Sequence, residues 1–266
     1  MASRPSAIEA LAAAPAAAAL VLDFDGVLAP IIEDPEASAI PEPTAASLAS
    51  LAASLGLVAV ISGRPAGFLA DRVRVPGIDL LGSYGMERLS GGRPHLDPAV
   101  RGWLGAVAAA GQLLAEELQG VPGIRIEAKP ASIAVHWRQA PDQVAAANLV
   151  RGSTGRAAAQ TGLRLTPGKL VEELRPPVDI DKGSAVAALI SAARPGAVAY
   201  AGDDLGDIPA LRVVREAGGY TLVVDHGAET HPRLLTVADE VFPGTPGFAD
   251  WLAALAAAAG AAAQRE

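Results

Sequence analysis

The chain has 266 residues, 51% of them hydrophobic and 19% charged, enough to bury the core of one large domain or two smaller ones. Lysine and arginine number 21 against 29 acidic residues, and the net charge of −8 argues against a nucleic-acid partner. There is no cysteine, which excludes disulfides and thiolate chemistry, and no apolar run of about 18 residues that could span a membrane. We therefore expect a cytoplasmic protein without membrane association.

The first residues do not have the pattern of a secretory signal. Residues 5–14 predict a short helix that Pro15 ends, and residues 16–22 predict a strand buried on both faces. A signal peptide begins with several positive charges, whereas Arg4 is the single early cation and Glu9 follows it. We expect this segment to remain part of the folded domain.

Two carboxylates, Asp23 and Asp25, follow this strand, and Gly26 comes next. Alternation along a strand would place both carboxylates on one side, where they repel unless a cation lies between them or one is protonated. Gly26 allows a sharp turn and a close approach to a ligand. Alternatives are an ordinary strand-to-turn junction or a calcium loop beginning D-x-D-G, although the later ligands and closing Glu of such a loop are missing.

The next segments repeat the order of helix and strand. Thr44 is expected to cap a helix that runs to Leu55, and the apolar strand 57–61 stops at Ser62-Gly63-Arg64. A hydroxyl and a glycine between a parallel strand and a helix can bind an anion, although the same residues also suit a simple turn.

A third apolar strand, residues 78–81, ends at Gly82-Ser83-Tyr84-Gly85. Strands that alternate with helices predict a parallel, doubly wound sheet, which binds ligands beyond the carboxyl ends of its strands. Asp23, Asp25 and Ser62 should therefore lie on one edge.

From about residue 98 the pattern changes to strands that alternate between apolar and polar residues. This is typical of an antiparallel sheet with one solvated face. The expected order is a helix (103–118), two strands (124–129, 132–138), a helix (142–159) and two strands (163–165, 169–175). The polar positions are Arg125, Glu127, Lys129, His136, Arg138, Lys169, Glu173 and Arg175. Singly, each suits a solvated surface, but together they could bind a polyhydroxylated ligand.

After Pro176-Pro177 the parallel pattern returns. A helix begins near Lys182, where a cation opposes the helix dipole unless an anion is close by. The buried strand 197–201 ends in Gly202-Asp203-Asp204-Leu205-Gly206-Asp207, whose carboxylates suit a hard cation. Strands at 220–224 and 239–242 and a helix at 248–263 complete the predicted elements.

The motifs D-x-D-G, S-G-R, K-G and G-D-D-x-x-D occur in this order, with the α+β insertion between the second and third. The chain in this respect resembles the haloacid dehalogenase superfamily of phosphotransferases. The resemblance implies an α/β fold: a doubly wound, mainly parallel sheet core with an inserted smaller α+β cap domain. The core would comprise residues 1–97 and 178–266, and the cap residues 98–177.

Within that superfamily the chain is more similar to trehalose-6-phosphate phosphatases over nearly its whole length. The similarity lies in Leu28-Ala29-Pro30-Ile31 after the first motif, Gly82-x-x-Gly85 with Glu87, Glu127-x-Lys129, His136-x-Arg138, and Gly168-Lys169 with Glu173-Leu174-Arg175-Pro176. Three departures are Val27 in place of Thr, Tyr84 in place of His, and Leu205-Gly206-Asp207-Ile208, which lacks the usual Thr and following acidic residue.

The resemblance implies a Mg²⁺-dependent phosphatase that acts through an aspartyl phosphate. Asp23 would be the nucleophile, Asp25 the general acid and base, and Ser62 and Lys182 would hold the phosphoryl oxygens. The implied metal-site residues are Asp23, Asp25 through its carbonyl, and Asp203, with Asp204 and Asp207 arranging the waters around the metal. The implied substrate-binding residues are Arg64, Glu127, Lys129, His136, Arg138, Lys169 and Glu173.

We expect the partner to be a small sugar phosphate and the protein to be a monomer. Trehalose 6-phosphate is the favoured substrate, with sucrose phosphate or a glycosylglycerate phosphate as alternatives. A sugar phosphomutase would share the aspartyl phosphate but return the phosphoryl group to a sugar. A non-catalytic sugar-phosphate sensor would lack turnover, and no expected catalytic carboxylate is missing.

Overall fold

The structure, a computed structural model, describes residues 4–32, 34–168 and 170–263. The chain forms two compact units: unit 1 comprises Met1–His95 and Ile180–Glu266, and unit 2 comprises Leu96–Asp179. These boundaries lie two residues from those expected, at 98 and 177.

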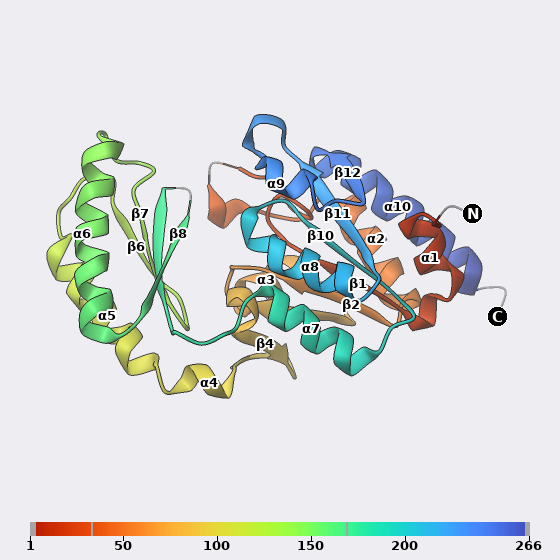
Figure 1. The fold of residues 1–266 in the computed structure, drawn as a ribbon, viewed down its shortest axis with the longest axis horizontal. Helices are drawn as coiled ribbons and strands as arrows, with labels where there is room; N and C mark the ends of the chain where they lie inside the picture. The colour runs from red at the N-terminus through yellow and green to blue at the C-terminus, as the bar shows by residue number, and fades with distance from the viewer. Residues whose placement is uncertain (1–3, 33, 169, 264–266) are drawn as a thin grey trace. The chain divides into compact units, whose positions relative to one another are not determined.

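Unit 1 is built on an eight-stranded sheet whose strand order is β12-β11-β10-β1-β2-β3-β4-β5 (Figure 1). Strands β12 through β3 of this order are parallel, and β4 is antiparallel to β3. The strands are β1 (Ala18–Leu22), β2 (Leu57–Ile61), β3 (Ile78–Gly82), β4 (Glu87–Ser90), β5 (Arg93–Leu96), β10 (Ala197–Gly202), β11 (Tyr220–Asp225) and β12 (Glu240–Pro243).

The helices of unit 1 precede, connect or follow its strands. They are α1 (Ala7–Ala13), α2 (Glu42–Ser54), α3 (Ala66–Val73), α7 (Lys182–Ala193), α8 (Ile208–Glu216), α9 (Pro232–Leu235) and α10 (Gly244–Ala263). Short 3₁₀ turns are η1 (Pro15–Ala17), η2 (Pro35–Ala37), η3 (Ser83–Gly85), η4 (Leu205–Asp207) and η5 (Gly227–Glu229).

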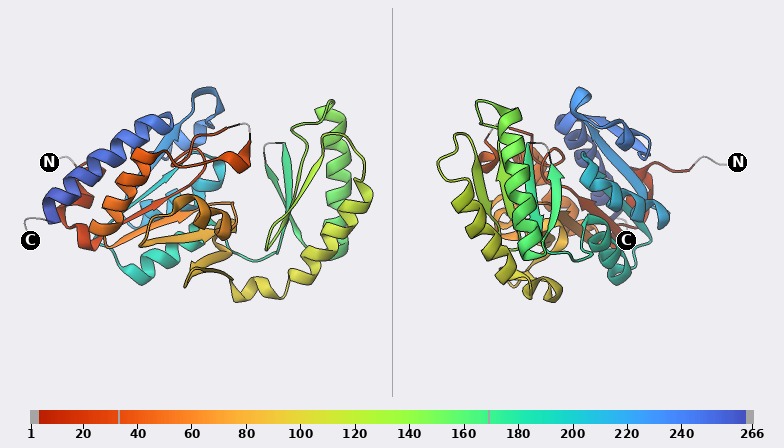
Figure 2. Two further views of the ribbon diagram at one scale, coloured as in Figure 1. Left: turned by 180° about the vertical axis from the view of Figure 1, so that it is seen from behind. Right: turned by 60° about the vertical axis from the view of Figure 1, so that its left-hand side comes forward.

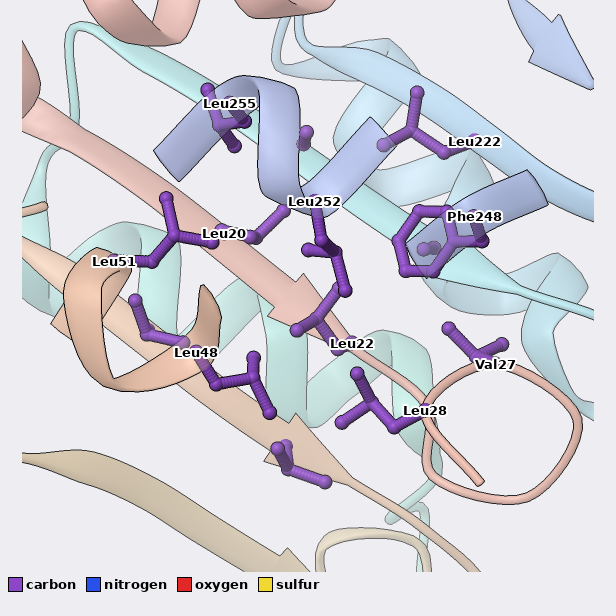
Figure 3. Close-up of a cluster of buried hydrophobic side chains, with 14 of the residues drawn as sticks. Leu20, Leu22, Val27, Leu28, Leu48, Leu51, Leu222, Phe248, Leu252 and Leu255 are labelled. Carbon is purple, nitrogen blue, oxygen red and sulfur yellow. The ribbon is translucent and has the colours of Figure 1, made fainter. Parts of the chain in front are cut away.

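The central strand β1 is buried on both faces, because its alternate side chains enter two different cores. On one face, Leu20 and Leu22 pack among leucines of α2 and α10 (Figure 3). These two helices lie side by side, as the left-hand view of Figure 2 shows. On the other face, Ala19 and Val21 join the core formed by α7, α8 and α9. The sheet is therefore doubly wound, with β1 at its centre.

Unit 2 contains a four-stranded antiparallel sheet in the order β6-β7-β9-β8. Its elements are α4 (Pro98–Arg101), α5 (Leu104–Glu117), β6 (Arg125–Ala128), β7 (Ile133–His136), α6 (Gln143–Thr161), β8 (Arg164–Gly168) and β9 (Val171–Arg175). Helices α5 and α6 cover one face, where Ile133, Val135 and Leu174 are buried (Figure 2). The expected alternation between an apolar and a polar face is confirmed.

Some element boundaries differ from the expectation. The second helix begins at Glu42, so Thr44 is buried within its first turn and is not the N-cap. The reason is Pro43, which fits the first helical turn because no intrahelical partner awaits its missing N–H. The last helix begins at Gly244, four residues earlier than expected. Strands β4 and β5 and helices α4, α8 and α9 were not foreseen.

No helix within residues 4–32, 34–168 and 170–263 combines the length and the hydrophobicity that spanning a membrane requires.

Candidate active site

Polar side chains follow four neighbouring parallel strands of unit 1. Asp23 follows β1, Ser62 follows β2, Asp203 follows β10 and His226 follows β11. Because these strands are parallel, their carboxyl ends meet at one edge of the sheet. The backbone joins the segments further: Asp23 N–H donates to the Ala201 carbonyl over 2.9 Å. The sheet topology therefore gathers residues that are far apart in sequence.

The centre of this edge is a buried ammonium between two carboxylates. Lys182 Nζ lies 2.6 Å from Asp207 Oδ1 and 2.9 Å from Asp23 Oδ1, and its side chain is only 4% exposed. Burial disfavours the charged form of Lys182, but Asp207 and Asp23 outweigh burial and raise its pKa. Burial raises the pKa of Asp23 well above its ordinary value, against the effect of Lys182. Lys182 is therefore a fixed positive charge.

Asp207 is the best-satisfied carboxylate of the site. Its Oδ1 accepts hydrogen bonds from Lys182 and from the Tyr200 hydroxyl, both over 2.6 Å. Its Oδ2 accepts from the backbone N–H groups of Asp203 and Asp204, over 3.0 and 3.1 Å. These four hydrogen bonds use the usual capacity of a carboxylate. Asp207 therefore holds Lys182 and shapes the 203–207 turn.

Asp23, Asp203 and Asp207 each offer an oxygen, and these oxygens lie within 4.8 Å of one another. When all three carboxylates are ionised, they carry two negative charges more than the Lys182 ammonium offsets, and a divalent cation would balance these charges. Asp23 Oδ1 is buried and accepts no hydrogen bond within the described part of the chain, although Lys182 is close to it. Burial and then the neighbouring carboxylates raise the pKa of Asp203 to about 8. The oxygen-only donor set fits Mg²⁺.

Two expected metal-site residues direct their side chains elsewhere. Asp204 is exposed, and its Oδ1 accepts from Gly206 N–H over 2.7 Å, so it caps the η4 turn. Asp25 pairs with Arg64. The expectation that Asp23 and Asp25 share one side assumed a strand through both, whereas β1 ends at Leu22. The side chains of Asp25 and Asp204 are outside the carboxylate cluster of the described residues.

Gly26 is required where the chain passes Asp203. Its φ is +79°, and a Cβ there would lie 2.0 Å from Asp203 Oδ2, so only glycine fits. The Gly26 carbonyl accepts hydrogen bonds from His226 Nε2 over 2.9 Å and from the Thr245 hydroxyl over 3.1 Å. His226 Nε2 is also 3.6 Å from Asp203 Oδ2. The first loop is thus attached to β11 and α10.

Ser62 and Arg64 connect the second strand to the next one. Ser62 is buried, and its Oγ accepts from Arg64 N–H over 3.2 Å. The Ser62 carbonyl accepts from Tyr84 N–H, and the Arg64 carbonyl from Ser83 N–H, both over 2.8 Å. Ser83 and Tyr84 have φ values of +49° and +61°, and the Tyr84 ring packs against Gly63. Strained backbone of this kind is often found at functional sites.

The polar face of the unit 2 sheet carries two carboxylates, each paired with a different basic side chain. Glu127 and Glu173 lie opposite Ala134 on neighbouring strands, so they share a face. Glu127 Oε2 accepts from His136 Nε2 over 2.8 Å, and this hydrogen bond lowers the pKa of Glu127 to about 2. Glu173 Oε1 accepts from Lys129 Nζ over 3.2 Å and from Ser132 Oγ over 2.5 Å. The structure thus brings Glu127, Lys129, His136 and Glu173 to one surface.

The remaining two expected residues of unit 2 have different outcomes. Arg138 is exposed in a turn after β7, because the strand ends at His136. Lys169 lies outside the described residues.

Sequence reasoning missed Tyr200 and His226. A tyrosine within the otherwise aliphatic strand 197–201 was a signal, because a buried phenol needs a hydrogen-bond partner. His226 follows a parallel strand at the same edge as Asp23 and Asp203, so the same topological rule could have identified it.

Comparisons with known proteins identify relatives of this chain. A profile of the trehalose-phosphatase family matches residues 21–234. A trehalose-phosphate phosphatase of Mycobacterium avium is 36% identical over 217 residues, which cover 78% of this chain and 54% of the relative. An uncharacterised glycosyl hydrolase of Mycobacterium tuberculosis is 38% identical over 216 residues, which cover 78% of this chain and 16% of the relative. The chain therefore spans about half the length of the phosphatase and a smaller part of the hydrolase.

Solved structures share the fold. A trehalose-6-phosphate phosphatase related protein superposes with a TM-score of 0.77 at 21% identity, covering 93% of this chain and all of that one. A haloacid dehalogenase-like hydrolase from Bacteroides thetaiotaomicron has a TM-score of 0.63 at 15% identity, with 88% and 97% covered. The predicted fold class is confirmed.

We predict that Asp207→Asn destabilises unit 1 by about 3–5 kcal/mol, because a buried cation and several donors lose a charged acceptor. Hydrogen exchange of unit 1 amides in urea measures this change. Asp204→Asn is the matched control on the same turn, where an asparagine caps equally well and the change should stay below about 1 kcal/mol. Equal effects of the two substitutions would contradict the role of Asp207.

A second prediction concerns acid stability. The pKa of Glu127 is about 2 in the folded chain and 4.5 ordinarily, so the unfolded chain binds more protons between these values. The folded state therefore loses this stabilisation as the pH falls from above about 4.5 towards 2. In Glu127→Gln this contribution is absent, so its urea-unfolding free energy should fall less over that range than that of the wild type. Parallel curves would show that the hydrogen bond from His136 does not stabilise the charged carboxylate.

Proposed function

The chain belongs to the trehalose-phosphatase family, and from this we propose that it hydrolyses trehalose 6-phosphate to trehalose and phosphate with Mg²⁺ as cofactor. The observation that best supports the proposal is the buried ion pair between Asp23 and Lys182, which lies beside Asp203. Asp23 also comes two residues before Asp25 in the sequence. A buried carboxylate beside a fixed cation at a sheet edge is suited to attack a phosphoryl group.

Asp23 is the proposed nucleophile. Its carboxylate oxygen bonds to phosphorus while the bond from phosphorus to the sugar oxygen breaks, which gives an aspartyl phosphate. Asp25 supplies the proton that the leaving sugar oxygen takes up. In the second half, Asp25 takes a proton from water as the water oxygen bonds to phosphorus and the aspartyl bond breaks. Asp23 and Asp25 are then ready for another cycle.

Ser62 and Lys182 are the proposed partners of the other phosphoryl oxygens. The positive charge of Lys182 is already held at the site by Asp207, so little reorganisation is needed when the phosphate enters. Ser62 lies at the end of the neighbouring strand, and its position is fixed by the backbone bonds of the 62–64 segment.

The residues that would hold Mg²⁺ are Asp23, Asp203 and the main-chain carbonyl of Asp25. Asp204 and Asp207 would not bind the ion directly but would arrange the waters around it. For Asp207 the reason is that its carboxylate already accepts four hydrogen bonds. When bound, the cation supplies charge neutralisation for the phosphoryl group. The grouping of three carboxylate oxygens within 4.8 Å of one another is the observation that supports a divalent ion.

Unit 2 is the proposed cap that recognises the sugar. The proposed contacts are Glu127, Lys129, His136, Arg138, Lys169 and Glu173. Carboxylates on a sheet face can accept hydrogen bonds from adjacent sugar hydroxyls. Ala134 lies between Glu127 and Glu173 in the strand register, so the two carboxylates are on the same face of the sheet.

We predict that the wild-type chain releases phosphate from trehalose 6-phosphate faster than from glucose 6-phosphate or sucrose 6-phosphate. Asp23→Asn should remove turnover, because the amide is not a nucleophile, and chelation should remove it reversibly. A phosphate-release assay with restored Mg²⁺ measures both effects. If the wild type prefers another sugar phosphate, the assignment of trehalose 6-phosphate as the substrate is wrong. If Asp23→Asn still turns over, the covalent step at Asp23 is wrong. Sugar bisphosphate formation or phosphoryl return to the sugar would indicate a mutase.

A separate prediction tests the role of unit 2. Glu173→Gln should lower kcat/KM for trehalose 6-phosphate about tenfold to hundredfold, the cost of one charged hydrogen bond. The loss with p-nitrophenyl phosphate should be much smaller, because this ester has no sugar for unit 2 to bind.

Glu172→Gln is the matched control for this test. Glu172 is adjacent in sequence but lies on the helix-facing side, where it accepts from Thr154 Oγ1 over 2.5 Å. We expect this substitution to affect stability and to leave the ratio between the two substrates unchanged. If Glu173→Gln lowers kcat/KM equally for both substrates, Glu173 stabilises the fold and does not bind the sugar.

A further inference from the structure

The Asp25 carboxylate is held from two directions. Arg64 donates to it twice, from Nε to Oδ2 over 2.8 Å and from Nη2 to Oδ1 over 3.1 Å. Ser38 Oγ donates to Oδ1 over 3.3 Å. This parallel pair of bonds from a planar guanidinium fixes the orientation of a carboxylate more firmly than an ammonium could.

The holding groups are themselves supported. The Arg64 guanidinium lies over the Phe68 ring, 4.7 Å from its centroid, and the Arg72 guanidinium lies 4.8 Å from the same centroid. Arg72 donates to the Ser38 carbonyl over 3.0 Å and to the Glu36 carbonyl over 2.7 Å. Helix α3 and the 36–38 segment are therefore joined behind Asp25. We refer to Ser38, Arg64, Phe68 and Arg72 as the Asp25 clamp.

We propose that Arg64 is a positioning residue that orients Asp25 for proton transfer, and is not a ligand of the phosphoryl group. The proposal rests on the function proposed above. An ionised carboxylate has about four acceptor positions, and the clamp occupies three, two through Arg64 and one through Ser38. The remaining position carries the proton that Asp25 gives to the leaving oxygen, and once that proton has left, it can accept a proton from the attacking water. Asp25 keeps access to a ligand, because its side chain is 37% exposed.

The surroundings of Arg64 support positioning over phosphate binding. Its side chain is 17% exposed, Nε and Nη2 both donate to Asp25, and Nη1 lies 4.0 Å from Glu36. The guanidinium is thus paired directly with Asp25 and lies within ion-pair distance of Glu36. Throughout the cycle it keeps its own protons: the transferred proton passes from Asp25 to the sugar oxygen, and later from water to Asp25.

The test is the dependence of rate on the leaving group. A sugar alkoxide needs a proton from Asp25 to leave, whereas p-nitrophenolate leaves without one. In Arg64→Gln, kcat for trehalose 6-phosphate should fall about tenfold to hundredfold, as expected for a misplaced catalytic group. With p-nitrophenyl phosphate kcat should change by less than about threefold, and KM for both substrates should stay nearly constant. Equal losses on both substrates, or a rise in KM, would overturn the proposal in favour of phosphoryl binding.

Two further variants keep the test decisive if Arg64→Gln folds poorly. Arg64→Lys keeps the charge but loses the paired geometry, and Ser38→Ala removes one hydrogen bond. Both should show the same selective loss on the sugar phosphate, smaller for Ser38→Ala. Arg88→Gln is the matched control, because Arg88 forms a similar pair with Asp79 over 2.6 Å on the surface of unit 1. That variant should leave both rates unchanged.

A double-variant cycle separates action through Asp25 from direct action. In an Asp25→Asn background, Arg64→Gln should add less than about a twofold loss on trehalose 6-phosphate, because its partner no longer transfers protons. Additive losses would overturn the proposal. Absence of phosphate release from every ester by the wild type would instead reject the proposed function, and this outcome differs from each of those above.

Discussion

The site depends on a single buried cation at the carboxyl end of the sheet. Lys182 lies between Asp23 and Asp207 with almost no exposure. Removing one partner of such a buried ion pair strongly destabilises the folded protein, because an unpaired charge stays buried. Asp207 is itself held in place, since it also accepts hydrogen bonds from the Tyr200 hydroxyl and from two backbone N–H groups of the 203–207 turn. The helix that begins at Lys182 and the turn after β10 are therefore fixed by the same carboxylate.

The doubly wound sheet explains how such a cluster arises from segments far apart in sequence. The parallel pairing of β1 with β2 and β10 sets the first carboxylates, the serine and the later carboxylates at one edge. The two hydrophobic cores anchor β1 from both faces, so the loop after it begins at a rigid point. The glycine after Asp25 then lets the backbone pass within contact of Asp203, and His226 and Thr245 hold its carbonyl.

Sequence patterns predicted the parallel strands of unit 1 and, except for His226, the polar residues that follow them, because apolar runs ending in small or acidic residues depend only on local order. They also predicted the antiparallel sheet of unit 2 and its polar face. They did not predict the partners of each carboxylate, which depend on tertiary packing. Arg64 was expected to contact substrate, yet its guanidinium is bound to Asp25. Alternation alone extended the polar row to Arg138, whereas the strand stops two residues earlier.

The environments of Asp23 and Asp25 differ in a way that suits two different roles. Asp23 is buried beside an ammonium and other carboxylates, so its oxygen can be directed at phosphorus with little water to compete. Asp25 is partly exposed and is held by a guanidinium and a hydroxyl, which restrict its rotation but leave it accessible. Two carboxylates placed in unlike surroundings can perform separate steps of one reaction. Asp23 is held by the core, whereas Asp25 is held by α3 and the 36–38 segment. We therefore expect substitutions in the Asp25 clamp to change the proposed proton transfer without disturbing the buried Lys182 cluster.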